Sequence, residues 1–344
     1  MITKIIAEAE IQKAKQYIED ADRIVIVTHI TPDGDAIGSS LGLYHFLLEM
    51  GKQANVIVPN DIPEFLRWMK GANDIIVHEK NHPIAEETIA AAELIFCMDF
   101  NVLKRIEKVA PAVEQSKAKK VMIDHHLSPG IFCNVTMSYP QISSTSEMVF
   151  RFICRMGFFE YLNKSCAECI YTGMMTDTGS FTYNSNKAEI YFIIGELIKK
   201  GINKDKIYAL VYNTVSIDRL KLQGYAIYEK MKIYPEYRTS LITLSQQELD
   251  KFNFQRGDTE GFVNIPLSSN DIVFSAFIKE DKGYVKISLR SKGDFSCNQF
   301  AMDNFNGGGH LNASGGEYFG SFENAIKHFE KVLPKYKELL LKNN

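Results

Sequence analysis

The chain has 344 residues, of which 45% are hydrophobic and 24% are charged, and its formal net charge is −3. This length suits about two domains, each with a buried core. The near-neutral charge does not favour a protein that binds long duplex DNA through its phosphates, and no run of about 18 apolar residues is present that could cross a membrane.

Residues 1–20 show the pattern of a charged amphipathic helix rather than the apolar core of a signal peptide, so we expect a cytoplasmic protein. The six cysteines fall mostly in apolar segments, which indicates reduced thiols rather than a disulfide framework. Cys166 and Cys169 form a single CxxC inside a helical pattern. Without a second pair, two thiols on one helix face are favoured over a zinc or redox site.

The first half of the chain alternates apolar, strand-like runs with helical patterns. The strand-like runs are residues 23–29, 55–60, 74–79, 94–100 and 119–126. The helical patterns are residues 36–50, 144–157 and 163–175. This alternation predicts an α/β fold with a mostly parallel sheet flanked by helices, in which ligands bind beyond the carboxyl ends of the strands.

The second half begins with long helices between Lys187 and Met231, where Gly201 is a helix cap. Strand patterns follow at residues 239–245, 271–280 and 283–290, then a glycine-dense stretch and a charged helix at 323–344. These features predict a second, smaller α/β domain. We therefore expect domains at 1–190 and 233–344, joined by a helical linker at 191–232.

Acidic and imidazole side chains gather where the predicted strands and helices end. Pro32, Asp33 and Gly34 suit a local turn, but a turn leaves His29 and Asp35 unexplained. The further candidates are Asp99, Asp124, His125, His126 and Asp177. Each of these alone could be a helix cap or a hydrogen-bonded core histidine. Their occurrence on separate segments favours one metal centre.

These motifs resemble those of the DHH phosphoesterase superfamily, which is named for the Asp-His-His triplet found here at 124–126. Residues 287–316, which include the sequence GGGH, resemble the DHH-associated nucleotide-binding domain. Together with the sequence EGFVNIPLS at 260–268, the chain is most similar to the bifunctional oligoribonuclease and pAp phosphatase branch, the NrnA-type nanoRNases. The resemblance covers nearly the whole chain.

The resemblance implies that the site binds two divalent ions, and it assigns each candidate ligand to one or both of them. His29 and Asp33 would bind one ion, Asp35, His125 and Asp177 the other, and Asp99 would bridge the two. Two such ions about 4 Å apart can activate a water and neutralise a phosphoryl transition state. Mixed carboxylate and imidazole ligands suit Mn²⁺, with Mg²⁺ or Co²⁺ as weaker substitutes.

The other two members of the triplet receive different roles. The resemblance assigns His126 to the scissile phosphate, where a proton donor would stabilise developing charge. Asp124 is expected to orient a neighbouring histidine, and a strand-end cap is an equally good interpretation.

The second domain is expected to bind the phosphate end of a nucleotide. Its candidate residues are Arg290, Ser291, Gly307, Gly308, Gly309 and His310. Three consecutive glycines allow backbone N–H groups to approach a phosphate, and residues 310–316 are compatible with a helix that would add its dipole. Arg290 could bind a terminal phosphate bidentately. The alternative is a glycine turn that serves folding alone.

We therefore predict a manganese-dependent phosphoesterase that hydrolyses short oligoribonucleotides to mononucleotides and the 3′-phosphate of pAp to give AMP. A phosphodiesterase for cyclic or linear dinucleotides, c-di-AMP or pApA, is the main alternative. A manganese pyrophosphatase fits the nucleotide-binding domain poorly, and a complete ligand set disfavours a non-catalytic nucleotide-binding regulator. The expected partners are short single-stranded RNA or mononucleotide bisphosphates, with no membrane; a homodimer stays open.

Overall fold

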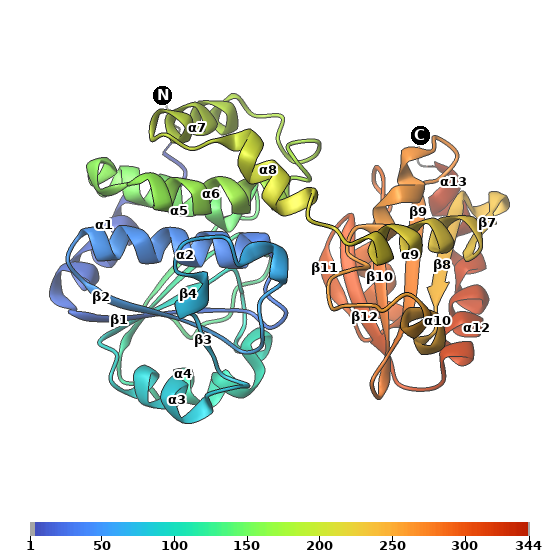
Figure 1. The fold of residues 1–344 in the computed structure, drawn as a ribbon, viewed down its shortest axis with the longest axis horizontal. Helices are drawn as coiled ribbons and strands as arrows, with labels where there is room; N and C mark the ends of the chain where they lie inside the picture. The colour runs from blue at the N-terminus through green and yellow to red at the C-terminus, as the bar shows by residue number, and fades with distance from the viewer. Residues whose placement is uncertain (1–3, 343–344) are drawn as a thin grey trace. The chain divides into compact units, whose positions relative to one another are not determined.

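The computed structural model describes residues 4–342 and divides the chain into two compact units, Met1–Thr214 and Val215–Asn344. The segment expected as a linker, 191–232, is helical and contains most of α7 (Ala188–Lys199), all of α8 (Lys204–Tyr212) and α9 (Ile217–Tyr228) (Figure 1). The division between the units falls inside this segment, after Thr214, so α7 and α8 belong to the first unit and α9 to the second.

The first unit is built on a parallel sheet of six strands in the order β3-β2-β1-β4-β5-β6. The strands are β1 (Arg23–Thr28), β2 (Gln53–Val58), β3 (Ile76–Val77), β4 (Leu94–Met98), β5 (Lys119–Asp124) and β6 (Val135–Ser138). Each of the five strand-like runs in this half of the sequence contributes a strand. The predicted parallel α/β fold is confirmed. β6 has only four residues and was not predicted.

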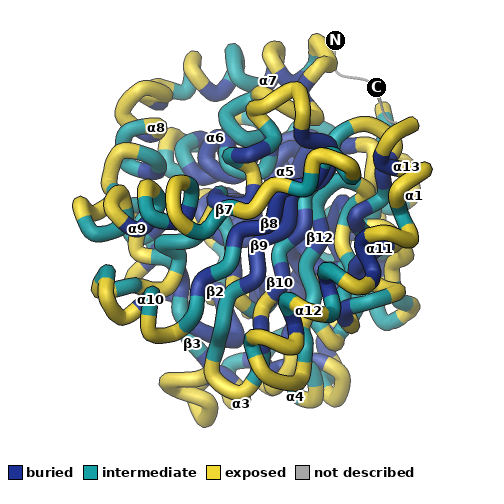
Figure 2. The backbone as a smooth tube through the Cα atoms, turned by 90° about the vertical axis from the view of Figure 1, so that its right-hand side faces the viewer, coloured by how far each residue is buried: buried dark blue, intermediate teal, exposed yellow. Residues whose placement is uncertain are grey.

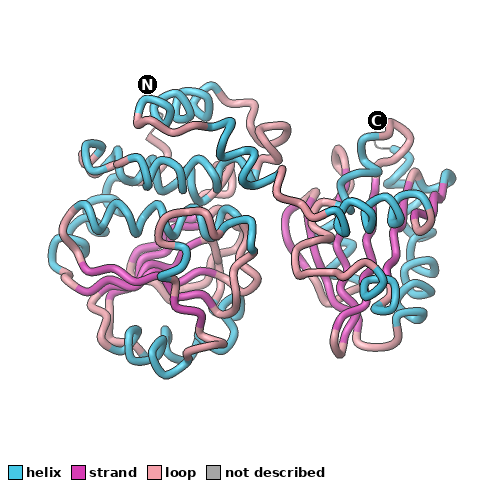
Figure 3. Tube along the Cα trace, in the orientation of Figure 1, coloured by secondary structure: helices cyan, strands magenta, loops and turns pink. Residues whose placement is uncertain are grey.

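Helices cover both faces of this sheet (Figures 1 and 3). On one face, five helices pack against the sheet and form one buried core with it. They are α1 (Glu8–Asp20), α2 (Gly34–Glu49), α5 (Thr145–Arg155), α6 (Lys164–Asp177) and α7. The helices α3 (His82–Ala90) and α4 (Ala110–Gln115) supply the core on the other face. Of the helix expected at the N-terminus, residues 1–3 lie outside the described part. The 3₁₀ segments are η1 (Glu64–Leu66), η2 (Ala72–Asp74), η3 (Leu103–Val109) and η4 (Phe159–Tyr161).

Helices α2 and α6 pack against each other at glycine. A Cβ atom at Gly38 would lie 2.6 Å from the carbonyl oxygen of Cys169, and one at Gly34 would lie 2.3 Å from Oγ1 of Thr176. Side chains at these positions would force the helices apart. This close contact fixes the start of α2 beside the end of α6, where Asp177 lies.

The second unit is built on a mixed sheet of six strands in the order β11-β12-β10-β9-β8-β7. The strands are β7 (Met231–Tyr234), β8 (Thr239–Leu244), β9 (Phe274–Asp281), β10 (Tyr284–Ser291), β11 (Gly308–His310) and β12 (Ala313–Tyr318). Only the β8–β9 pair is parallel among these described strands. The inner strands β8 and β9 are largely buried (Figure 2).

The interpretation of residues 310–316 as helix-compatible is wrong. These residues belong to the antiparallel β11–β12 pair, in which Gly309 is opposite Ser314 and His310 is opposite Ala313. A hairpin can form here because the glycine-rich backbone can approach its neighbour closely. A phosphate at this loop therefore cannot use the dipole of a helix starting at 310.

Two apolar clusters cover the two faces of the second sheet. One contains α11 (Cys297–Asn304), α12 (Phe322–Val332) and α13 (Lys337–Lys342), and the other contains α9, α10 (Gln246–Lys251) and η6 (Phe262–Ser268). The charged helix expected at 323–344 is interrupted by η7 (Leu333–Tyr336), which contains Pro334, and residues 343–344 lie outside the described part. The remaining 3₁₀ segment is η5 (Pro235–Tyr237). Within residues 4–342, no helix combines the length and apolar character needed to span a membrane.

Candidate metal centre

The candidate ligands lie where neighbouring strands of the first sheet end. His29 directly follows β1, Asp99 directly follows β4, and the triplet at 124–126 begins with the last residue of β5. These three strands are adjacent and parallel, so their carboxyl ends lie at one edge of the sheet. Asp35, in the first turn of α2, and Asp177, the last residue of α6, reach the same edge.

The structure brings the six expected ligands together in two groups. One group is His29, Asp33 and Asp99, and the other is Asp35, His125 and Asp177; within each group, ligand atoms lie within 4.8 Å of one another. Asp99 faces both groups, because its Oδ2 is 3.4 Å from Nε2 of His29 and its Oδ1 is 3.6 Å from Nε2 of His125. A carboxylate in this position could contact an ion held by either group.

Backbone carbonyl groups orient the two histidines. Nδ1 of His29 lies 2.8 Å from the carbonyl oxygen of Ile30, and Nδ1 of His125 lies 3.3 Å from that of Ile142. With the proton assigned to Nδ1, each ring keeps an Nε2 lone pair directed at the carboxylates. Nε2 of His29 is buried and has no hydrogen-bond partner within the described part of the chain. A metal ion fits this position because it would supply the missing partner.

Asp35 and Asp177 lie close to other carboxylates, which disfavours their ionised forms. Burial, together with Asp99 and Asp177, raises the pKa of Asp35 well above its usual range. Burial also raises the pKa of Asp177 to about 7, despite the opposing charge of His125. Divalent cations bound at this edge would relieve the repulsion and stabilise the ionised carboxylates.

Asp99 and His125 have pKa values shifted toward their charged forms. Burial opposes the ionisation of Asp99, but His29, His126 and His125 outweigh it and lower the pKa of this carboxyl below its usual range. Burial likewise opposes the protonation of His125, but the surrounding carboxylates, Asp177 first, raise its pKa to about 9. The carboxylates around His125 therefore favour a positive charge at this position, which a bound cation would also supply.

Asp33 has a structural role as well as a place among the ligands. Its Oδ1 accepts hydrogen bonds from the backbone N–H groups of Asp35 and Ala36, each at 3.0 Å, and so caps α2. The local interpretation of this turn and the metal interpretation are thus compatible. Thr31 and Asp99 both have positive φ, at 50° and 60°, which indicates backbone strain concentrated at this edge of the sheet.

Asp124 orients His126. Nδ1 of His126 lies 2.8 Å from Oδ1 of Asp124, and the backbone N–H of His126 donates to Oδ2 of the same carboxylate at 3.1 Å. The rings of His125 and His126 meet at 71° with centroids 5.0 Å apart. Asp99, Asp124 and His126 also form a third set of ligand atoms within 4.8 Å of one another.

The start of α5 is a part of the site that the sequence analysis missed. The backbone N–H groups of Thr145 and Ser146 donate to Asp35, and the Thr145 hydroxyl donates to Asp99. The run of serine and threonine at 143–146 signals a helix cap. It does not reveal which carboxylates the capped turn contacts, because those come from distant segments.

In the second unit, Arg290 and His310 lie at the same end of the sheet. Both are register partners of Ala313, Arg290 from β10 and His310 from β11, on either side of β12. The hydroxyl of Ser291 donates to the carbonyl oxygen of Phe295 at 2.6 Å, so it stabilises the following loop. Arg290 NH1 donates to the carbonyl oxygen of Leu289 at 2.9 Å.

The three glycines are not equivalent. A Cβ atom at Gly307 would lie 2.0 Å from the carbonyl oxygen of Gly315, and one at Gly309 would lie 2.5 Å from that of Ala313, so close packing of strands requires glycine at both positions. At Gly308 the nearest atom to an added Cβ would be 3.6 Å away, which is ordinary contact. Folding therefore explains two of the glycines, and only the third is free of a packing requirement.

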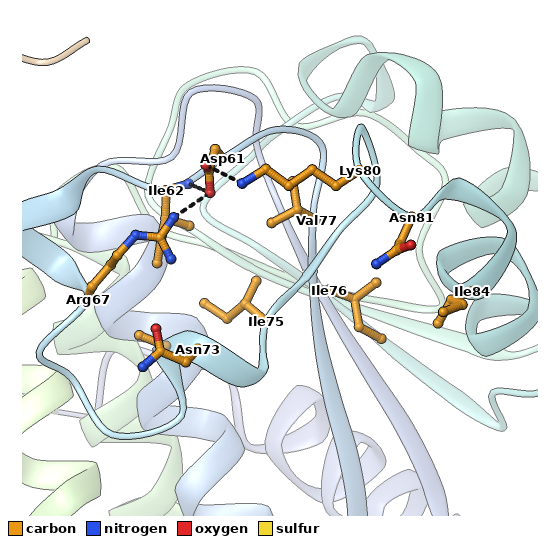
Figure 4. A pocket seen from close by; sticks show the side chains of 11 residues that line it. Asp61, Ile62, Arg67, Asn73, Ile75, Ile76, Val77, Lys80, Asn81 and Ile84 are labelled. Carbon is orange, nitrogen blue, oxygen red and sulfur yellow. Dashed lines mark hydrogen bonds and ion pairs between the residues drawn. The ribbon is translucent and has the colours of Figure 1, made fainter. Parts of the chain in front are cut away.

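A pocket of about 320 Å³ lies elsewhere in the first unit, beside the edge strand β3. Its wall includes Ile75, Ile76 and Ile84, and at its rim Asp61 accepts hydrogen bonds from Arg67 at 2.7 Å and from Lys80 at 2.5 Å (Figure 4). None of the candidate site residues lines this pocket. Its two cationic groups are already paired with Asp61.

Comparison with known proteins identifies two family domains in this chain. Residues 23–174 match the model of the DHH family, N-terminal domain, and residues 239–335 match the DHHA1 domain. The chain is 28% identical over 322 residues to the bifunctional oligoribonuclease and PAP phosphatase NrnA of Thermus thermophilus, a match covering 92% of this chain and 90% of that protein. It is 22% identical to the cyclic-di-AMP phosphodiesterase PdeA of Listeria monocytogenes, covering 90% of this chain and 47% of that protein.

A solved structure shows the same fold at higher identity. An exopolyphosphatase-related protein from Bacteroides fragilis is 57% identical, with a TM-score of 0.95 and coverage of 98% of this chain and 99% of that chain. The two family domains together include the candidate ligands at the strand ends of the first unit, but not Asp177, and the glycine-rich strands of the second. The chain belongs to the DHH phosphoesterase family and is a hydrolytic enzyme with a DHHA1 domain.

Proposed function

We propose that this enzyme is a manganese-dependent phosphoesterase that hydrolyses short oligoribonucleotides to mononucleotides and converts pAp to AMP by removing its 3′-phosphate. The observation that carries the proposal is the position of Asp99, whose two oxygens face two separate groups of ligands. A relative with 28% identity over most of both chains is named as a bifunctional oligoribonuclease and PAP phosphatase, which supports this substrate class.

The residues suited to hold the ions are those of the two groups. His29 and Asp33 would bind one Mn²⁺, Asp35, His125 and Asp177 the other, and Asp99 both. When bound, such a pair supplies an activated water and neutralises charge on the phosphoryl group. Imidazole ligands favour Mn²⁺ over Mg²⁺, which prefers oxygen ligands and water.

His126 is suited to donate a proton or hydrogen bond to the scissile phosphate. Its ring is fixed through Nδ1, which lies 2.8 Å from Oδ1 of Asp124, and the donor role would fall to Nε2. The buried Asp124 fixes the tautomer and the ring orientation, as a carboxylate does behind a catalytic imidazole. The chain's own contribution to the reaction is thus a fixed proton donor beside the metal ligands.

The second unit would bind the phosphate end of the substrate. Arg290 offers a planar pair of N–H donors, and His310 and the backbone of Gly308 lie at the same end of the sheet. Short RNA and pAp share what this arrangement requires, a small nucleotide with a phosphate at one end and a phosphoester at the other. A cytoplasmic location and a homodimer stay predictions.

A second candidate function is hydrolysis of cyclic or linear dinucleotides, c-di-AMP or pApA. The observation that favours it is the similarity to PdeA, which is named as a cyclic-di-AMP phosphodiesterase. The chain matches about half of that protein, 47% of its length, and the similarity is lower than to the NrnA of Thermus thermophilus.

A substrate panel tests the proposal. Protein stripped of metal with EDTA is assayed with and without Mn²⁺ on an RNA dinucleotide, pAp, pApA and c-di-AMP, with bis-p-nitrophenyl phosphate as a generic diester. We expect Mn²⁺-dependent turnover of the RNA dinucleotide and pAp, and its loss in Asp99→Asn. Preferred turnover of c-di-AMP would support the second function. No Mn²⁺-dependent turnover of any substrate would overturn the proposal.

A further inference from the structure

The first turn of α5 contacts one carboxylate from each ligand group. The N–H of Thr145 donates to Oδ2 of Asp35 at 2.6 Å, and the hydroxyl of Thr145 donates to Oδ1 of Asp99 at 2.8 Å. The N–H of Ser146 donates to the other oxygen of Asp35 at 2.9 Å. Thr145 is fully buried, and it is the residue through which a single helix start holds both acids.

The hydrogen bond from the Thr145 hydroxyl differs from the usual bond of a helical threonine. A threonine hydroxyl in a helix commonly bonds to a carbonyl oxygen one turn earlier, as Thr172 does in α6, where Oγ1 donates to the carbonyl of Glu168 at 2.7 Å. The hydroxyl of Thr145 instead donates to a carboxylate 46 residues away. A hydrogen bond to a charged acceptor is stronger and more directional than one to a neutral carbonyl.

A buried ion pair supports this turn from inside the helix. Oε2 of Glu147 accepts the backbone N–H of Ser143 at 3.0 Å and its hydroxyl at 2.6 Å, and Oε1 accepts Nε of Arg151 at 2.7 Å. Glu147 and Arg151 are both almost fully buried, at 1% and 2% exposure. Burying such an ion pair carries a desolvation cost. The pair fixes the path of the backbone into the start of α5.

The two oxygens of Asp99 point toward different ligand groups, an arrangement that suits a bridge between two ions. Oδ2 faces His29 while Oδ1 faces His125, and only Oδ1 receives the Thr145 hydroxyl. Removing that donor would lower the cost of rotating the carboxylate so that both oxygens lie on one side. A bridge would then become a chelate of a single ion, and the second ion would lose a ligand.

We propose that Thr145 is a positioning residue for the metal pair: its hydroxyl fixes Asp99 as the bridge while its backbone N–H fixes Asp35. The inference rests on the proposed two-metal function and adds a residue to it. Thr145 does not act on substrate directly. The Glu147–Arg151 pair holds the backbone from which Thr145 acts, so the support extends a full turn into α5.

The test compares Thr145→Val, which removes the hydroxyl at nearly constant shape, with Thr145→Ser, which keeps it. Thr172→Val is the matched control, because it removes another buried helical hydroxyl of the same unit. Mn²⁺ is titrated into each metal-free protein, and bound metal is counted by mass spectrometry. Electron paramagnetic resonance distinguishes isolated Mn²⁺ from a spin-coupled pair, and thermal unfolding measures folding.

We expect Thr145→Val to bind one Mn²⁺ normally, to bind the second about 10- to 100-fold more weakly, and to lose the coupled-pair signal. Thr145→Ser should restore both the affinity and the signal, and Thr172→Val should match the wild type. If Thr145→Val does not fold, Thr145→Ala compared with Thr145→Ser gives the same contrast.

Wild-type affinity and a normal coupled signal in Thr145→Val would overturn the positioning role while leaving the proposed function intact. A wild-type protein that binds fewer than two Mn²⁺ ions would overturn the proposed function itself, and the positioning role with it.

Discussion

Gly173 of α6 lies directly against the carboxylate of Asp35: a Cβ atom at position 173 would come within 2.8 Å of Oδ1 of Asp35 and 1.9 Å of Oγ of Ser146. The absence of a side chain at this position is what lets α2, α5 and α6 meet at the ligand groups. Part of the candidate metal centre therefore depends on a residue that offers no side-chain ligand atom.

Gly173→Ala should weaken Mn²⁺ binding and reduce turnover, because the methyl group displaces Asp35 or the start of α5. A clash with the side chains of Ser146 and Asp35 in a packed core costs about 1–3 kcal/mol of unfolding free energy. Gly195→Ala is the control, since an added Cβ there meets no atom within 4 Å, and it should stabilise α7 by about 1 kcal/mol. Calorimetry and Mn²⁺ titration of both variants make the comparison. Normal Mn²⁺ affinity in Gly173→Ala would contradict the role given to this contact.

His126→Ala should lower kcat by about 10²-fold or more while two Mn²⁺ ions still bind, because the side chain is proposed to act on the transition state. Asp124→Asn should show a smaller effect of the same kind, since the amide alters the tautomer of His126 without removing the ring. Metal content and kcat on pAp and an RNA dinucleotide are measured together. Loss of one metal equivalent in His126→Ala would identify His126 as a ligand, in line with its place beside Asp99 and Asp124.

Arg290→Ala should raise KM for pAp by about 10- to 100-fold, which corresponds to a charge-assisted contact of about 1.5–3 kcal/mol. Hydrolysis of bis-p-nitrophenyl phosphate should be unaffected, because this diester has no terminal phosphate to bind. Lys327→Ala, an exposed cation on α12 of the same unit, serves as the control. An equal loss on both substrates would argue against phosphate binding by Arg290.

Removal of metal should destabilise the first unit and leave the second unit unchanged. Asp35, Asp99 and His125 are buried at the ligand groups, so ions that bind the folded form alone stabilise it by mass action, by about 2.7 kcal/mol at 100 times Kd. The stability of each unit is measured by thermal unfolding with Mn²⁺ and with EDTA, monitored by hydrogen exchange at peptides from that unit. Equal shifts in both units, or none, would be the contrary result.

The sequence was sufficient for strands β1 to β5 because each lies in a short, largely apolar run, as RIVIVT before His29 shows. It also predicted the candidate ligands, and the structure brings these residues together in two groups at one edge of the sheet. It was not sufficient for β6, whose four residues VTMS carry little pattern. Thr145 was missed because its importance depends on Asp35 and Asp99, which are more than 40 residues away along the chain.

In the glycine-rich stretch, the local sequence pattern predicts the wrong element. Residues 310–316 contain polar and small residues that fit a helix as well as a strand, and the pairing of β11 with β12 decides between them. The glycines at 307 and 309 are required by contacts with Gly315 and Ala313, which no local pattern encodes. A glycine-rich sequence therefore indicates close approach of the backbone without saying whether the approaching group is a ligand or another strand.

The left-handed backbone at Asp99 limits which amino acids position 99 can accept without strain. Its φ of 60° suits asparagine, aspartate and glycine, whereas a β-branched residue would be strained by about 1–2 kcal/mol. In a saturation library at position 99, abundance of folded protein should therefore be highest for Asn and Gly, the variants that lack the bridging charge. Folding and activity would rank the same substitutions in different orders, so a screen for soluble protein alone would enrich inactive enzyme.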